Sequence, residues 1–184
     1  MRKFEVPARD QVSPENQGIF DNLKDKVGFV PNVYATYAKS DNGLGRYLTF
    51  ANGKTSLSAK EKEAINLVVS QVNGCRYCQS AHTVLAKMNG FSEDQIFQIR
   101  QGEAPFDKRI DALVKLSKSI ALHHGRPEDE TLENYFNAGY SESDLVDLIL
   151  AIGDRITTNY LNKIFRIPVD FPLAPELGSI ETFK

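Results

Sequence analysis

The chain has 184 residues, 41% of them hydrophobic, and a formal net charge of −2. That length fits one compact domain, built as a single unit or as two small helical halves that share a core. The dispersed charges exclude the basic footprint of a nucleic-acid-binding protein, and no apolar run approaches the roughly 20 residues that span a membrane. The first residues lack the apolar stretch of a signal peptide, so we expect a cytoplasmic protein, in which permanent disulfides are rare.

Helical patterns dominate the chain from its start, and no convincing strand pattern occurs. Ser13-Pro14 predicts the beginning of a first helix and Gly28 its end, with a buried face formed by Ile19, Phe20, Leu23 and Val27. Pro31 can open a short second helix, and Asp41 can cap a third. Several aromatic residues of these helices either cover a site elsewhere in the fold or serve in ordinary packing: they are Tyr34, Tyr37, Tyr47 and Phe50.

The stretch from Ser58 to Gly90 carries the strongest chemical signal. Its first helix begins with an S-x-x-E capping box formed by Ser58 and Glu61. Apolar residues then form a wide face for the core: Ala64, Ile65, Leu67, Val68, Val69 and Val72. A polar line follows the same helix at helical spacing and consists of Glu63, Asn66, Ser70 and Asn73.

Both cysteines of the protein lie on the next predicted helix, which we expect to begin with an N-cap at Asn73. Cys75, Cys78 and His82 fall at positions i, i+3 and i+7, which places both sulfurs and the imidazole on one stripe of the helix. Backbone N–H groups without helical partners and the positive end of the helix dipole lie at such a helix start. This position lowers the pKa of a thiol.

These residues supply the parts of an activated sulfur nucleophile. A thiolate is the reactive form of cysteine, and His82, one turn along the helix, can take the thiol proton. A short turn at Asn73-Gly74 would fold the two helices into a hairpin, from which Glu63 could face the sulfur site. In the cytoplasm a lone C-x-x-C is redox-active or metal-binding more often than structural.

Two later segments, Gly90 to Ile96 and Gly139 to Leu145, share one local pattern. In each, a glycine ends a helix, an aromatic residue follows, and a serine caps the next helix. The repetition predicts two related helical halves, of which only the first contains cysteines. The helix between them ends at His123-His124, a pair that we interpret as structural because adjacent helical residues point in different directions.

The last helix is predicted over about residues 142–165 and is apolar on most sides. Gly153 leaves room for another helix to approach. The large apolar side chains of this helix either lie at the centre of the fold or face another subunit: Ile149, Ile152, Ile156, Tyr160 and Ile164. Asn159 and Asn162, about one turn apart, either hydrogen-bond near a substrate or are solvent-exposed or backbone-capping amides. Residues 166–184 contain Pro168, Pro172 and Pro175, so we expect an extended tail that packs along a groove or a neighbouring subunit.

The pattern E-x11-C-x-x-C-x3-H on two consecutive helices resembles that of the alkylhydroperoxidase AhpD-like family, within the carboxymuconolactone decarboxylase-like superfamily. Four residues match it one by one: Glu63, Cys75, Cys78 and His82. Residues 28–32 and 167–172 are similar to segments of the longer, peroxidase-related members. One position departs from the pattern, because Tyr77 precedes the second cysteine where the best-known members often have histidine.

The resemblance implies an all-α, AhpD-like fold in which residues 1–184 form a single domain, with the redox motif at 58–90. It implies homo-oligomers and a thiol peroxidase that uses neither cofactor nor metal and reduces hydroperoxides, organic ones in particular. By this resemblance Cys78 is the peroxidatic cysteine and Cys75 resolves it. Glu63 and His82 then relay the proton, and an external dithiol, thioredoxin-like or lipoyl-bearing, re-reduces the pair.

Other interpretations of the cysteine site remain open from the sequence. The side chains of Cys75, Cys78, His82 and Glu63 could bind zinc or act as a redox sensor without turnover, although one straight helix strains a tetrahedral site. A non-redox enzyme of the lactone-decarboxylase type is a further alternative, although that branch generally lacks the cysteine pair. The two cysteines could also be small buried hydrophobic residues.

Overall fold

The computed structural model describes residues 3–177, which form nine α-helices, one short 3-10 helix and no β-strand. This result confirms the predicted all-α fold. None of the helices in this part of the chain is long and apolar enough to cross a membrane. In chain order the elements are η1 (Arg9–Gln11), α1 (Pro14–Val27), α2 (Asn32–Tyr37), α3 (Gly43–Ala51), α4 (Ala59–Val72), α5 (Arg76–Met88), α6 (Glu93–Gln101), α7 (Lys108–Leu122), α8 (Asp129–Asn137) and α9 (Glu142–Phe165).

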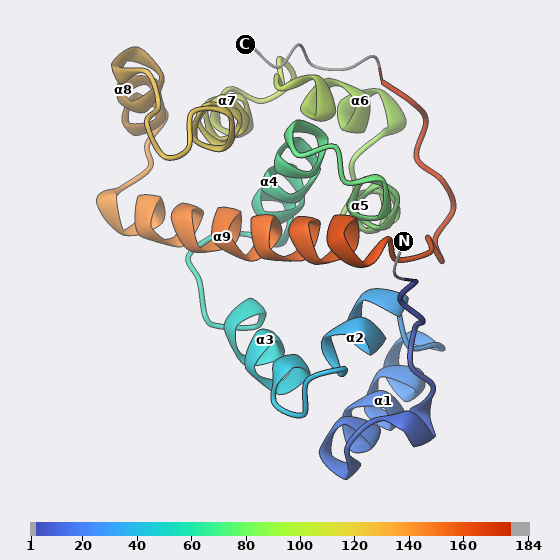
Figure 1. The fold of residues 1–184 in the computed structure, drawn as a ribbon. Helices are drawn as coiled ribbons and strands as arrows, with labels where there is room; N and C mark the ends of the chain where they lie inside the picture. Colours follow the sequence, from blue (N-terminus) through green and yellow to red (C-terminus); the bar gives the residue numbers. More distant parts are fainter. Residues whose placement is uncertain (1–2, 178–184) are drawn as a thin grey trace.

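The long helix α9 crosses the middle of the molecule and separates two groups of helices (Figure 1). Helices α4 to α8 lie on one side and α1 to α3 on the other. Helix α4 is the centre of the larger group, since it packs against α5, α6, α7 and α9. Its apolar face is buried as predicted, with Ile65, Leu67 and Val68 fully enclosed in the main hydrophobic core.

Local capping signals set most helix boundaries. The predicted capping box at Ser58 is present, because Ser58 Oγ accepts from the N–H of Glu61 while the Glu61 side chain accepts from the N–H of Ser58. The repeated pattern produces the same arrangement at Ser92 and Ser141, the residues before α6 and α9. Two local predictions are wrong: α3 is preceded by Asn42 rather than capped by Asp41, and Val27 is 51% exposed instead of buried.

The tail after α9 is fastened to the N-terminal helices through Asp170. Asp170 Oδ2 accepts a hydrogen bond from the backbone N–H of Asn32 at 2.7 Å, and Asn32 Nδ2 donates to the carbonyl of Pro168 at 3.0 Å. The Tyr77 hydroxyl accepts from the N–H of Val33. Burial and a hydrogen bond to Asp170 raise the pKa of Tyr77 well above its usual range. Segments 28–32 and 167–172 therefore meet directly, and we call this group of contacts the Asp170 clasp.

A buried arginine holds the next part of the tail. The Arg100 side chain is 1% exposed and donates hydrogen bonds to the carbonyl of Pro175 and to one glutamine each of α4 and α5. The N–H of Ala174 donates to Ser80 Oγ at 3.1 Å. The tail runs past α5 toward α6 (Figure 1). The predicted extended conformation is confirmed up to residue 177, and residues 178–184 of the predicted tail lie outside the described part of the chain.

We expect Asp170→Ala to lower the free energy of unfolding by about 1–3 kcal/mol, because the N–H of Asn32 loses its charged acceptor. Glu176→Ala is the matched control in the same tail, since its side chain is 89% exposed and lies 4.0 Å from Arg76. It should change stability by less than about 0.5 kcal/mol. Urea unfolding followed by circular dichroism measures both, and equal stabilities of the two variants would show that the clasp does not hold the tail.

Candidate active site

The thiol of Cys75 itself caps α5. The helix begins at Arg76, and Cys75 Sγ accepts a hydrogen bond from the N–H of Cys78 at 3.4 Å. The expectation that Asn73 caps this helix is wrong, because Asn73 ends α4 and Gly74 then turns the chain with a positive φ of 62°. The helical hairpin and the position of both sulfurs at the start of α5 are as predicted.

The two thiols form an asymmetric pair. Both cysteines are 1% exposed, and Cys75 Sγ donates a hydrogen bond to Cys78 Sγ across 2.8 Å. The pKa of Cys78 is lowered to about 6: this hydrogen bond is the largest cause, and the charges of Arg155 and His82 act with it against the effect of burial. The same hydrogen bond and burial raise the pKa of Cys75 far above its usual value. Cys78 is therefore the thiolate of the pair, and Cys75 is the thiol that stabilises it.

Glu63 and His82 are in direct contact, as the family resemblance implies. Glu63 Oε2 lies 2.7 Å from His82 Nδ1, and both side chains are buried. Asn66 Nδ2 donates to the other carboxylate oxygen at 3.3 Å. Burial raises the pKa of Glu63, but the charge and the hydrogen bond of His82 outweigh it, so the net shift is downward. The carboxylate thus fixes the imidazole ring through Nδ1.

Sequence reasoning missed Arg155, a buried residue of α9. Its guanidinium donates from Nε to Asn66 Oδ1 at 3.0 Å and from Nη2 to Asp154 Oδ2 at 3.4 Å. Its positive charge lowers the pKa values of Cys78 and Glu63. Because Arg155 is only 6% exposed, water screens this charge weakly. It is the principal fixed positive charge acting on the Cys78 thiolate.

Two asparagines lie on the same face of α9 as Arg155, nearer to the sulfurs. Asn162 Nδ2 lies 3.5 Å from Cys78 Sγ, and Asn159 Nδ2 donates to Ser70 Oγ at 3.2 Å. Both side chains are buried, so the solvent-exposed interpretation is wrong. Arg155, Asn159 and Asn162 follow the spacing i, i+4, i+7. That spacing is the signal in the sequence that could have identified Arg155 as part of the site.

Cys78 and His82 lie on the wall of a small cavity of about 90 Å³. The wall also contains Arg155 and four aromatic rings: Tyr34, Tyr47, Tyr77 and Phe171. Tyr34 and Tyr47 come from α2 and α3, so these helices cover the site, as one of the two sequence interpretations expected. A larger groove of about 490 Å³ shares His82 and Arg155 with the cavity and is lined by parts of α3, α4, α5 and α9.

Tyr37 and Phe50 do not line this cavity wall directly. Tyr37 stacks on the ring of Tyr47 with centroids 4.1 Å apart, and its hydroxyl lies 3.1 Å from Thr158 Oγ1. Phe50 is 45% exposed and lies at the larger groove. Tyr37 therefore supports the ring of Tyr47, and Phe50 lines the groove that adjoins the cavity.

The four side chains considered for zinc are not arranged as a metal site. No group of three or more His, Cys, Asp and Glu side chains within residues 3–177 is placed to hold a metal ion. The pair His123-His124 lies at the end of a helix, away from the cysteines. His123 is the C-cap of α7, and both histidines are exposed.

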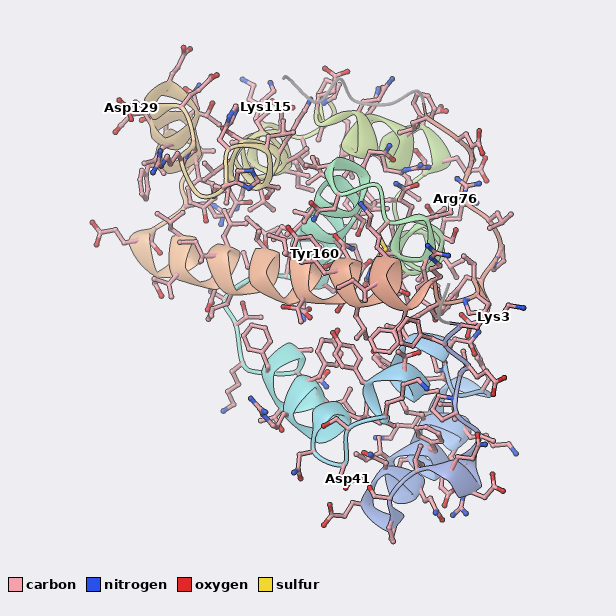
Figure 2. All side chains as sticks on the ribbon, viewed as in Figure 1. Lys3, Asp41, Arg76, Lys115, Asp129 and Tyr160 are labelled. Atoms are coloured by element: carbon pink, nitrogen blue, oxygen red, sulfur yellow. The ribbon has the colours of Figure 1, made fainter. Side chains whose placement is uncertain are left out.

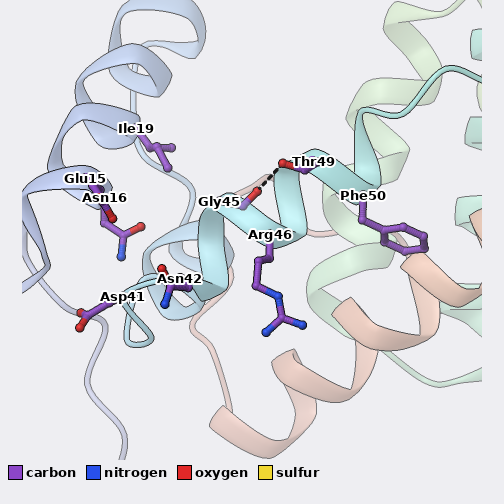
Figure 3. Close-up of a pocket in the computed structure, with 9 residues that line it drawn as sticks. All are labelled: Glu15, Asn16, Ile19, Asp41, Asn42, Gly45, Arg46, Thr49 and Phe50. Atoms are coloured by element: carbon purple, nitrogen blue, oxygen red, sulfur yellow. Dashed lines mark hydrogen bonds between the residues drawn. The ribbon is translucent and has the colours of Figure 1, made fainter.

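Another groove, of about 550 Å³, lies between α1 and α3 (Figure 3). Its wall combines Glu15, Asp41 and Arg46 with the apolar Ile19. It contains neither cysteine nor histidine. This groove therefore offers neither a thiol nor an imidazole, and the smaller cavity beside Cys78 is the better candidate for thiol chemistry.

Known proteins share this fold and this motif region. Residues 35–116 match the model of the carboxymuconolactone decarboxylase family. Uncharacterized protein YdfG of Bacillus subtilis (strain 168) is 30% identical over 118 residues, which are 63% of this chain and 76% of that protein.

Several solved structures have the same fold as this chain. An uncharacterized peroxidase-related protein from Silicibacter sp. TM1040 has a TM-score of 0.78 at 24% identity and 89% coverage of both chains. An AhpD-core, peroxidase-related protein from Ralstonia eutropha JMP134 has a TM-score of 0.82 at 18% identity, covering 91% of this chain and 92% of that one. The debrominase Bmp8, solved in complex with 2,3,4-tribromopyrrole, has a TM-score of 0.75 at 16% identity and 92% coverage of both.

We expect alkylation of Cys78 by iodoacetamide to slow as the pH falls through about 6, because protonation removes the reactive thiolate. In Arg155→Met the midpoint of the alkylation rate as a function of pH should move to higher pH, since the buried positive charge is lost. Arg155→Lys keeps the charge and is the matched control, with a smaller shift. Peptide mass spectrometry at a series of pH values measures the rate at each cysteine. Identical midpoints in the Met and Lys variants would show that Arg155 does not set the pKa of Cys78.

Proposed function

The chain belongs to the carboxymuconolactone decarboxylase family and has the fold of its AhpD-like, peroxidase-related members, and from this premise we propose that it is a thiol peroxidase. The observation that carries the proposal is the asymmetry of the cysteine pair. Cys78 has a lowered pKa and lies on the cavity wall, whereas Cys75 has a raised pKa and lies 2.8 Å away. One nucleophile and one resolving thiol are the parts that a two-cysteine peroxidase needs.

In the proposed reaction the Cys78 thiolate attacks the terminal oxygen of a hydroperoxide. An S–O bond forms, the O–O bond breaks, and the leaving alkoxide takes a proton to become an alcohol. Cys78 is now a sulfenic acid. The thiol of Cys75 attacks its sulfur, forms the Cys75–Cys78 disulfide and releases water. An external dithiol, thioredoxin-like or lipoyl-bearing, then reduces this disulfide by thiol exchange and becomes a disulfide itself.

The proposed role of His82 is to move the proton. It accepts the proton of the Cys78 thiol and returns it to the leaving oxygen, as a general base and then a general acid. Glu63 positions the ring through the 2.7 Å contact to Nδ1 and stabilises the protonated form. Tyr77, at the position where the best-known members often have histidine, bonds Val33 of α2 and Asp170 of the tail.

The cavity supports an organic hydroperoxide as substrate. Its aromatic wall favours an apolar group beside the O–O bond, and Arg155 offers hydrogen-bond donors to the oxygens. A space of about 90 Å³ suits a small substrate, and a longer one would extend into the adjoining groove.

A second candidate uses the same cysteines on a different electrophile. The aromatic wall around Cys78 also suits a flat halogenated ring, and the debrominase solved with tribromopyrrole has this fold. In such a reaction Cys78 attacks the bromine of a C–Br bond, an S–Br bond forms, and the ring carbon takes a proton. Cys75 then displaces bromide, and the pair ends as the same disulfide.

We expect one equivalent of cumene hydroperoxide to remove both free thiols of the reduced protein and about 2 Da of its mass, because a disulfide forms. Cys78→Ser should lose no thiol. Cys75→Ser should gain one oxygen as a sulfenic acid and then stop. Thiol titration with intact-mass spectrometry measures all three proteins. Oxidation by 2,3,4-tribromopyrrole but not by the hydroperoxide would replace the first candidate with the second, and oxidation by neither would contradict both.

We expect Glu63→Gln to slow thiol oxidation by about 10-fold or more, because the amide can still contact His82 but cannot stabilise its charged form. Glu61→Gln is the matched control on the same helix, since Glu61 bonds Ser58, Arg109 and Tyr140 rather than the histidine. It should reduce stability without changing the rate. Stopped-flow oxidation rates and thermal unfolding separate the effects, and a Glu63→Gln protein that unfolds would make this carboxylate structural.

A further inference from the structure

Reduction of the cysteine pair needs a contact that the structure as it stands does not allow. Both cysteines are 1% exposed, and the cavity beside Cys78 has a volume of only about 90 Å³. Thiol exchange nevertheless requires the thiolate of an external dithiol to reach one of the two sulfurs directly. In the proposed peroxidase cycle, part of the structure therefore has to move at every turnover.

A hydrophobic cluster of its own, separate from the main core, encloses the two cysteines. Much of its cover comes from the start of α2 and from the tail after α9: Val33, Ile167, Val169 and Phe171. Figure 2 labels Arg76 on the side of α5 that the tail passes. The tail is therefore one of the layers that separate the sulfurs from solvent.

The Asp170 clasp lies in this cover. Tyr77 and Phe171 both line the small cavity, and their rings meet edge to face with centroids 5.7 Å apart. The Tyr77 hydroxyl accepts from the N–H of Val33, another residue of the cavity wall, and hydrogen-bonds Asp170. Asp170 in turn accepts from the N–H of Asn32. The clasp thus holds one wall of the cavity closed.

The segment that carries Asp170 is anchored at both ends and irregular between them. Residues 168–173, which we call the strap, contain neither helix nor strand. Before the strap, the N–H of Ile167 donates to the carbonyl of Asn162 at 3.2 Å. After it, the N–H of Ala174 donates to Ser80 Oγ at 3.1 Å. Irregular segments with few buried contacts open locally at a much lower free-energy cost than core helices. The strap can therefore lift without unfolding the helices on either side.

On the basis of the peroxidase function above, we propose that the strap is the gate for the reductant. When the Asp170 clasp releases, the strap lifts from α5, the wall of the cavity opens, and an external dithiol reaches the Cys75–Cys78 disulfide. One thiolate of the dithiol attacks a sulfur of the pair and forms a mixed disulfide. Its second thiol then closes on the first, which leaves both cysteines reduced and the reductant as a disulfide. The hydroperoxide does not need this gate, because the larger groove meets the cavity at His82 and Arg155.

Reduction kinetics of the preformed disulfide test the gate. Diamide first oxidises the pair, so that the result does not depend on whether the protein turns over hydroperoxides, and dihydrolipoamide then reduces it. We expect Asp170→Ala to be reduced about 10-fold or more faster than the parent protein, because its strap opens more often. Asp170→Asn, which retains an oxygen acceptor, should fall between the two. Glu176→Ala, the matched control in the same tail, should keep the parent rate. Quenching by alkylation and intact-mass spectrometry follow the loss of the disulfide.

A core variant separates local opening from global unfolding. Val114→Ala removes buried methyl groups from the main core, outside the cysteine cluster, and destabilises the whole fold. It should be reduced at the parent rate. Equal acceleration by Val114→Ala and Asp170→Ala, or a parent rate in Asp170→Ala, would overturn the proposal. A gate changes the rates in both directions alike, so the equilibrium between the protein and dihydrolipoamide should not move. A shifted equilibrium in Asp170→Ala would show that the clasp stabilises one redox state instead of controlling access.

Discussion

The buried charge of Arg155 has to be balanced inside the helical core, and this requirement joins the helices that build the site. An unpaired charge in such a place costs several kcal/mol. One compensating group is Asp154, beside Arg155 on α9. The others come from two further helices: Glu63 and Asn66 from α4, and the Cys78 thiolate from α5. The carboxylate in turn holds His82. The charges that activate the nucleophile thus also connect α4, α5 and α9, which pack together through the hydrophobic core.

The parts of the site that lie close together in sequence were predictable, because short-range helical geometry decides them. The polar line on α4 and the spacing of Cys78 and His82 on α5 required only a turn between two helices to bring Glu63 to the imidazole. The beginning of α9 followed from the cap at Ser141. The error at the start of α5 is also local, since the thiol of Cys75 supplies the cap that an asparagine side chain was expected to provide.

The contacts that sequence reasoning missed all join distant segments. Arg155 lies more than seventy residues from either cysteine in the chain, and only the packing of α9 against α4 and α5 brings it to them. The Asp170 clasp is a second example. The tyrosine at position 77 looks like a departure from the family pattern, but its hydroxyl bonds both Val33 of α2 and Asp170 of the tail. No local pattern gives the partner of such a side chain, because the tail has no helical or strand periodicity.

Oxidation of the cysteine pair would change this charge balance. A thiolate and a thiol become a neutral disulfide, so Arg155 loses the negative charge of Cys78 and keeps that of Glu63. The fixed charge of Arg155 therefore favours the reduced state of the pair, in the way that a stabilised thiolate makes any C-x-x-C disulfide easier to reduce. For the proposed peroxidase this is an advantage, since every turnover must end with reduction by an external dithiol. The guanidinium that makes Cys78 a nucleophile thus also helps to return it to its starting state.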